Sequence, residues 1–252
     1  MTVLVPLLAA AFEFSAGSPE SWAMLAGSAA SDWQAFSCMN PAAVCAAGRF
    51  GAGAAYCQPF RLEGVNWARA SAGASRGRWA AGLAAASLFS SGYHENDWQV
   101  AFGGRPLSSL SVGIGVHLLT VASMAAPAFD AGVVWETGNL RVGASGMRVN
   151  VPRFANGDEL PLRLTLGASA RPVPPLLLCL DLSREGRTET AALGAEFNLV
   201  PPLDLRAGAS YEPLTYGLGF GVHVGFATLD YAYRFHPQLK ETHLIGVSAA
   251  WN

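Results

Sequence analysis

The chain has 252 residues, of which 51% are hydrophobic and only 13% are charged, roughly half the charged fraction of an ordinary soluble domain. The formal net charge of −2 offers no basic surface for nucleic acid, so that class of partner is excluded. The mean hydropathy of +0.28 is high, yet no apolar run reaches the roughly eighteen residues of a membrane-spanning helix. A β-barrel in lipid and a soluble β-protein with a large core both fit this composition.

Residues 1–16 predict a signal peptide for export. The stretch 2–14 is largely apolar, and Ala9-Ala10-Ala11 supplies small residues of the kind found at cleavage sites. Because no Lys or Arg precedes this stretch, an ordinary buried segment is the alternative. Residues 17–48 form a second segment, and residues 49–252 form one strand-rich domain.

The strand-rich domain divides into about fourteen segments that predict β-strands, most of them long enough to cross a bilayer at a tilt. Turn-forming residues such as Ser90-Ser91-Gly92 and Pro201-Pro202 separate several of them, and residues 152–161 predict a longer loop. The predicted strands are 49–60, 65–76, 78–90, 96–104, 109–123, 128–137, 139–150, 161–171, 175–184, 187–199, 203–212, 214–225, 226–236 and 240–251.

Side chains of opposite character alternate along these segments. In 226–236, Leu229, Tyr231 and Phe235 form one series, while Asp230 and Arg234 belong to the other. Successive side chains of a strand point to opposite faces, so such a segment has one apolar and one charged face. An open sheet edge is not viable in hydrocarbon, because unpaired backbone groups there are costly. The sequence therefore predicts an all-β fold, a closed antiparallel transmembrane β-barrel of about fourteen strands.

Charged residues of both signs fall on the predicted inner face, where we expect them to pair because unpaired buried charges are costly. They either hold the barrel together or line a polar conduit for a substrate. His117 and His223 also face the lumen in this interpretation, as hydrogen-bonding residues. The predicted lumen network is Asp130, Glu136, Arg163, Arg171, Asp181, Glu196, Asp204, Arg206, Asp230 and Arg234.

Aromatic residues near the predicted strand ends suit the two interfacial girdles of a membrane barrel, although a core stripe could explain any one of them. These residues are Phe60, Trp67, Trp79, Phe89, Trp98, Trp135, Tyr211, Phe235 and Trp251.

The cysteines and histidines show no metal-binding spacing, so we expect no metal and no cofactor. In an exported protein, Cys38 and Cys45 are the simplest candidates for a disulfide; the alternative is that all four cysteines are small buried hydrophobes. The stretch Gly143-Ala144-Ser145-Gly146 is one residue short of the G-x-S-x-G nucleophile motif. With no other nucleophile signature present, we expect the protein not to be an enzyme.

An ordered set of short motifs resembles the PorV/PorQ-like branch of the FadL-type outer-membrane β-barrel proteins. A small-residue run, Ala26-Gly27-Ser28-Ala29, leads to the turn Asn40-Pro41-Ala42 just before the first strand. Further matches follow in order: Asp130-Ala131-Gly132, Asn150-Val151-Pro152, Leu160-Pro161, Gly194-Ala195-Glu196, Leu205-Arg206-Ala207-Gly208, Tyr216-Gly217-Leu218-Gly219 and Leu229-Asp230-Tyr231-Ala232-Tyr233.

This resemblance implies a fourteen-stranded barrel in the bacterial outer membrane, with residues 17–48 as a plug in or across the lumen. Asn40, Pro41 and Ala42 would then be the turn by which the plug leads into the first strand. FadL-type barrels move hydrophobic molecules, which implies outer-membrane lipid and a hydrophobic ligand as partners. PorV-like relatives serve protein export and surface attachment, so a non-transporting barrel that docks secretion-system proteins is the alternative.

Overall fold

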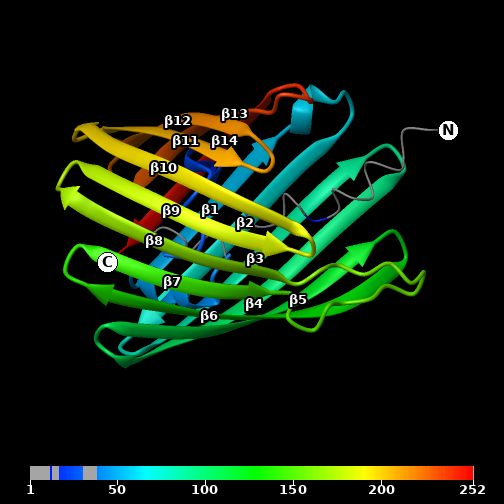
Figure 1. Cartoon of the computed structure of the whole chain (residues 1–252), viewed down its shortest axis with the longest axis horizontal. Coiled ribbons are helices and arrows are strands. Elements are labelled where there is room, and N and C mark those ends of the chain that lie inside the picture. The colour runs from blue at the N-terminus through cyan, green and yellow to red at the C-terminus, as the bar shows by residue number, and fades with distance from the viewer. Residues whose placement is uncertain (1–11, 13–16, 31–38, 252) are drawn as a thin grey trace.

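The computed structural model describes residue 12 and residues 17–30 and 39–251. Fourteen strands form one closed barrel in which each strand lies beside its neighbours in sequence (Figure 1). The strands are β1 Phe50–Cys57, β2 Asn66–Arg76, β3 Trp79–Ser90, β4 Tyr93–Leu107, β5 Leu110–Val121, β6 Met124–Thr137, β7 Leu140–Met147, β8 Arg163–Val173, β9 Leu176–Glu185, β10 Thr188–Val200, β11 Leu203–Tyr211, β12 Thr215–Val224, β13 Ala227–Phe235 and β14 Thr242–Trp251.

The barrel closes where β1 pairs with β14 as well as with β2. Phe50 lies opposite Trp251 and Cys57 opposite Leu244, so the seam is paired along the whole of β1. Every pairing around the ring is antiparallel. Closure leaves no unpaired sheet edge, which is the condition for spanning hydrocarbon. The predicted barrel and its fourteen strands are confirmed.

The two faces of the strands differ as the alternation predicts. Leu229 is 53% exposed, whereas its neighbour Asp230 is 5% exposed and faces the lumen. Large apolar side chains are exposed on every strand except β2, which gives the barrel an apolar outer surface suited to lipid. Trp79, Trp135 and Trp251 lie on this surface near strand ends. The placement of Trp67 in a girdle was wrong, because Trp67 is 1% exposed and packs inside against Trp22.

The two ends of the barrel have connections of different length. At one end, where the C-terminus lies, six hairpins turn through two residues each, such as 77–78 and 108–109. The other end carries longer connections, including 58–65, 148–162 and 236–241 (Figure 1). We call them the short-turn end and the long-loop end. The predicted loop 152–161 lies at the long-loop end, where Arg153 and Glu159 form an isolated bridge.

The described residues 17–30 and 39–48, here called the inner segment, lie against the inner wall of the barrel. Helix α2, Pro19–Met24, begins at Ser18, which forms a capping box with Ser21, and ends at Leu25 in the left-handed region. It contacts β10 to β14, while the 3₁₀ helix η2, Pro41–Ala46, contacts β2 to β6. No helix in the described ranges is long and apolar enough to span a membrane.

The inner segment follows the wall in an ordered path. Pro19 lies against β14, Met24 against β10 and β11, Ala29 against β7 and β8, and Val44 against β3 and β4. The chain then enters β1, and Ser75 of β2 binds the Gly48 carbonyl with its backbone N–H at 2.9 Å. The described parts of the segment therefore contact most of the circumference of the barrel.

Glycines on the inner wall mark this path. They pair across strands in register: Gly73 with Gly82, Gly103 with Gly113, Gly113 with Gly132, Gly143 with Gly167, and Gly194 with Gly208 and Gly208 with Gly217. A Cβ on Gly194 would lie 2.6 Å from the Met24 carbonyl oxygen, and one on Gly167 would lie 2.9 Å from the Ala29 Cβ. Side chains at these positions other than Gly73 and Gly82 would collide with the inner segment. Glycines on eleven of the strands, from Gly246 on β14 to Gly73 on β2, face the inner segment in this way. We call these glycines the glycine belt.

We expect Gly194→Ala to destabilise the protein by about 1–3 kcal/mol, because the added methyl must displace the Met24 carbonyl. Gly53→Ala is the matched control, since its methyl would come no closer than 3.4 Å to any neighbour. Urea unfolding in lipid or detergent, followed by the loss of heat-resistant migration on SDS gels, measures both. Equal stability of the two variants would contradict the tight contact.

Candidate functional site in the barrel lumen

Arg206 on β11 is the centre of a buried charge cluster. Its Nε donates to Glu196 Oε2 at 2.8 Å and its Nη1 to Asp230 Oδ1 at 2.6 Å. Asp204 Oδ2 lies 3.6 Å from Nη2. All four residues are at most 6% exposed, and they come from β10, β11 and β13. A buried arginine with several carboxylates satisfies the requirement that buried charges be paired, so this part of the predicted network is formed by strands of the wall.

The Arg206 cluster continues toward the short-turn end. His223 Nε2 lies 2.6 Å from Asp204 Oδ2, and Thr228 Oγ1 lies 3.0 Å from His223 Nδ1. His223 is 42% exposed at its side chain, which places it at the mouth of the lumen. The cross-strand pairing of His223 with Thr228 at the end of the β12–β13 hairpin produces this contact.

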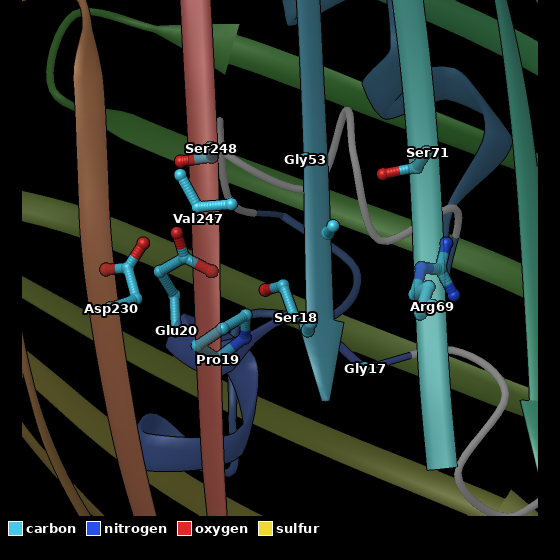
Figure 2. Close-up of a pocket in the computed structure, with 12 residues that line it drawn as sticks. Gly17, Ser18, Pro19, Glu20, Gly53, Arg69, Ser71, Asp230, Val247 and Ser248 are labelled. Carbon is cyan, nitrogen blue, oxygen red and sulfur yellow. The ribbon is translucent and has the colours of Figure 1, made fainter. Parts of the chain in front are cut away.

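A small cavity of about 30 Å³ lies beside this cluster, between the start of α2 and strands β1, β2, β13 and β14. Figure 2 shows the carboxyl groups of Glu20 and Asp230 on one side of it and Arg69 on the other. Glu20 is therefore the point at which the inner segment brings a charge toward the Arg206 cluster.

A second buried cluster surrounds His117 on β5. Its Nδ1 lies 2.8 Å from Asp97 Oδ1, and its Nε2 lies 2.6 Å from Asp130 Oδ2 and 2.9 Å from Gln99 Nε2. The backbone N–H of Arg148 donates to the other oxygen of Asp130 at 2.8 Å. His117 and both aspartates are at most 5% exposed. This cluster holds strands β4, β5 and β6 together.

Asn40 anchors the inner segment to itself and to the wall. Its Nδ2 donates to the Ala29 carbonyl at 2.7 Å and to the Val133 carbonyl at 3.3 Å, while its Oδ1 accepts from Ala42 N–H at 3.0 Å. Asn40 is fully buried, and Pro41 follows it as the first residue of η2. The side chain therefore joins the two described stretches of the inner segment. Its role in leading a plug into the first strand stays a prediction.

The remaining predicted network residues lie outside the two clusters, except that Arg171 reaches Glu196 of the Arg206 cluster. Asp181 Oδ2 accepts from Ser28 N–H at 2.7 Å, which ties the wall to the inner segment. Glu136 pairs with Arg141, a partner that the sequence analysis did not name. Arg171 lies 3.8 Å from Glu196, and Arg163 lies 3.8 Å from Glu185. Arg234 stands over the ring of Trp22, at 5.2 Å from its centroid.

The sequence analysis missed Asp97 and Gln99, which complete the His117 cluster. The predicted fourth strand began at residue 96, whereas β4 begins at Tyr93. Asp97 and Gln99 already alternate with Trp98 and Val100 within the predicted strand, and Glu95 extends this polar series in β4; this alternation is the signal that could have placed them inside.

The cysteines do not support the predicted disulfide. Cys45 is a buried free thiol in η2, and Cys38, its predicted partner, lies outside the described residues. Burial raises the pKa of the Cys45 thiol, against the opposing effect of Arg105, so it stays protonated near neutral pH. Arg105 donates to the Cys45 carbonyl at 2.6 Å and so holds η2 to β4. Among the described residues, no group of three or more His, Cys, Asp and Glu could hold a metal ion.

Solved structures of hydrocarbon channels are similar in fold to this chain. No family model matches the chain, and no curated protein does. Among solved structures, the Ralstonia pickettii toluene transporter TbuX matches at 13% identity with a TM-score of 0.71, covering 96% of this chain and 100% of that one. The Pseudomonas putida toluene transporter TodX matches at 13% identity and 0.70, covering 93% and 98%.

A Pseudomonas aeruginosa FadL homologue also matches, at 12% identity with a TM-score of 0.68, over 93% of this chain and 98% of that one. At such identities the likeness shows the fold, which is that of FadL-type barrels. It does not distinguish the PorV/PorQ-like branch.

We expect Arg206→Leu to destabilise the protein by about 3–5 kcal/mol, because Glu196 and Asp230 would be left buried without their cation. Arg61→Leu is the control, since Arg61 pairs with Glu241 at the surface, where its side chain is 62% exposed. Urea unfolding in lipid or detergent compares the two. Ion flux in liposomes tests the conduit alternative: an unchanged flux with lost stability would reject it.

We expect Asn40→Ala to loosen the inner segment, because three carbonyls and one N–H would lose their hydrogen-bond partner, at a cost of about 1–3 kcal/mol. Cells producing this variant should become more sensitive to large antibiotics that the outer membrane normally excludes. Asn150→Ala is the control, because Asn150 makes comparable backbone hydrogen bonds at an exposed strand end. Equal sensitivity in both variants would argue that Asn40 does not restrain the inner segment.

Proposed function

We propose that this protein is a bacterial outer-membrane barrel that carries small hydrophobic molecules across that membrane. The observation that carries the proposal is the correspondence of its fold, over nearly the whole chain, with barrels described as toluene transporters. The apolar outer surface supports a location in lipid. The six two-residue turns at one end fit the periplasmic side of such a barrel, and the longer connections fit the extracellular side.

The distribution of contacts in the lumen supports passage between the inner segment and the wall. The Arg206 and His117 clusters join wall strands to one another, so the barrel keeps these ion pairs if the inner segment shifts. Ala23, Met24 and Ala29 of the inner segment lie against glycines of the wall, whereas Ser28 and Asn40 form hydrogen bonds with it. The glycine contacts are dispersive and non-directional, so moving along them breaks few strong bonds.

A barrel that docks other proteins is the second candidate. The observation that favours it is the continuous strand pairing around the wall. A barrel whose interior remains filled would act through its loops. Exposed apolar residues at the long-loop end, including Leu62, Val151 and Leu239, would then contact secretion-system proteins.

Uptake of radiolabelled toluene tests the proposed transport. We expect cells with an intact lipopolysaccharide layer to take up toluene faster when they produce this protein in the outer membrane. The control is the same strain producing an unrelated porin-type barrel at equal abundance. Equal uptake in the two strains would contradict transport. Dependence of surface-protein attachment on this barrel, in a strain that retains normal uptake without it, would favour docking.

A further inference from the structure

An open groove of about 990 Å³ lies on the outer face of the barrel, over β2 to β5 near the short-turn end. Gly103 and Gly113 line it, and the lumen sides of these two glycines are covered by Val44 and Pro41 of the inner segment. Within the described ranges, no residue of the inner segment lines the groove. The groove therefore opens away from the lumen, on the surface that faces lipid.

Two rows of paired positions give the groove its shape. From β2 to β5, the first row is Ala74, Ala81, Phe102 and Ile114, and the row nearer the short-turn end is Arg76, Trp79, Gly104 and Val112. Phe102 and Ile114 are 54% and 59% exposed, and Trp79 is 76% exposed. A Cβ on Gly104 would lie 3.1 Å from the Trp79 ring, so the ring lies across this glycine. The alanines and the glycine are the floor of the groove, and the large side chains are its walls.

Arginines lie at the short-turn end of the groove. Arg49 and Arg76 line it, and Arg78 follows in the turn between β2 and β3. All three are exposed. Among the residues that the structure describes, none of the three forms an ion pair. Their charges are therefore available to a ligand.

The sequence places no carboxylate near these arginines on the arc from β1 to β5. No Asp or Glu occurs in residues 48–62, 64–94 or 98–114, which supply the short-turn half of this arc. On the next strand, Glu136 of β6 pairs with Arg141. This arc of the short-turn end thus carries positive charge that the neighbouring strands do not compensate.

The arginines, rather than the apolar groove, would select a lipid. In a bilayer any acyl chain can fill an apolar groove, so the groove alone distinguishes no lipid from another. Guanidinium groups match phosphate geometry with two parallel donors, and each basic side chain at the membrane surface favours an anionic lipid. Trp79 suits the same depth, because tryptophan rings concentrate where a membrane meets water. A surface for an anionic headgroup and a surface for an acyl chain therefore adjoin.

We propose that this groove binds one anionic phospholipid from the leaflet at the short-turn end. Its phosphate contacts Arg49 and Arg76, and one acyl chain lies over Ala81 beside Phe102. This inference goes beyond the proposed transport. It requires the barrel to lie in lipid, and it does not require any molecule to pass through the lumen.

Native mass spectrometry of the purified full chain, released from detergent with added lipid, tests the selection. The probes are phosphatidylglycerol and phosphatidylcholine with the same acyl chains, so they differ only in the headgroup. We expect one phosphatidylglycerol to be retained, with an affinity at least roughly fivefold above that of phosphatidylcholine. Equal retention of the two lipids would overturn the proposal. So would release of the lipid by a large excess of inorganic phosphate, because the site would then bind free anions.

Substitutions locate the binding. Arg49→Gln and Arg76→Gln should each weaken phosphatidylglycerol binding roughly fivefold. Arg187→Gln is the control, because it removes the same charge from an exposed turn at the long-loop end and should change nothing. Heat-resistant migration on SDS gels confirms that each variant is folded. A lipid preference unchanged in both groove variants, or lost equally in the control, would overturn the assignment.

A second kind of variant tests the groove itself. Ala81→Trp fills the floor and leaves every charge in place, so it should also reduce lipid retention several-fold. Retention equal to that of the unmodified chain would reject the acyl-chain part of the site. A lipid-free dimer that this variant dissociates would overturn the proposal and assign the groove to a second copy of the chain.

The lipid measurement and the uptake measurement fail separately. Selective lipid binding without toluene uptake would reject the proposed function and leave this site. Toluene uptake without lipid selection would reject the site and leave the proposed function.

Discussion

The structure depends on the close approach of the inner segment to the barrel wall. Backbone atoms of Met24 and Ala29 lie where a Cβ on the facing strand residue would have to be, so the wall carries glycine at those points. A barrel of this size normally fills its interior with side chains or with water. Here main chain and small residues of the inner segment occupy much of that space. This constraint accounts for glycines inside long strands, which would otherwise weaken a sheet.

The glycine belt also determines where the charges lie. On β11, Gly208 belongs to the belt. Arg206, the next inward-facing residue toward the short-turn end, is the centre of one cluster. On β5, Gly113 belongs to the belt and His117 lies beyond it toward the long-loop end. The two charged clusters are thus on opposite sides of the belt and on different arcs of the wall. Each is paired within neighbouring strands, which stabilises the wall independently of the inner segment.

Alternation along the strands was sufficient to predict the barrel, because it depends only on which face meets lipid. It also contained information on Trp67, which shares its face with Arg69 and Gly73 and therefore belongs inside. The partners of individual charges were less predictable. His117 meets Asp97 because β4 pairs with β5 in a register that places Gln99 opposite His117. The contact of Asp181 with Ser28 joins residues far apart in the chain, and no local pattern specifies it.

The same reasoning explains why the inner segment combines firm and weak attachments. Asn40 and Ser28 make buried hydrogen bonds, and the stretch just before β1 is held by Ser75, which bonds Gly48, and by Arg105, which bonds Cys45. Among the described residues, Ala23, Met24 and Ala29 lie against glycines of the wall. Directional bonds fix its position, whereas the glycine contacts set only how close it lies to the wall. A displacement of α2 past the glycines that keeps the hydrogen bonds of Ser28 and Asn40 would cost less than opening the strand ladder, since each backbone hydrogen bond broken in lipid costs several kcal/mol. Movement of the inner segment, rather than separation of two strands, is therefore the less costly way to open a path through this barrel.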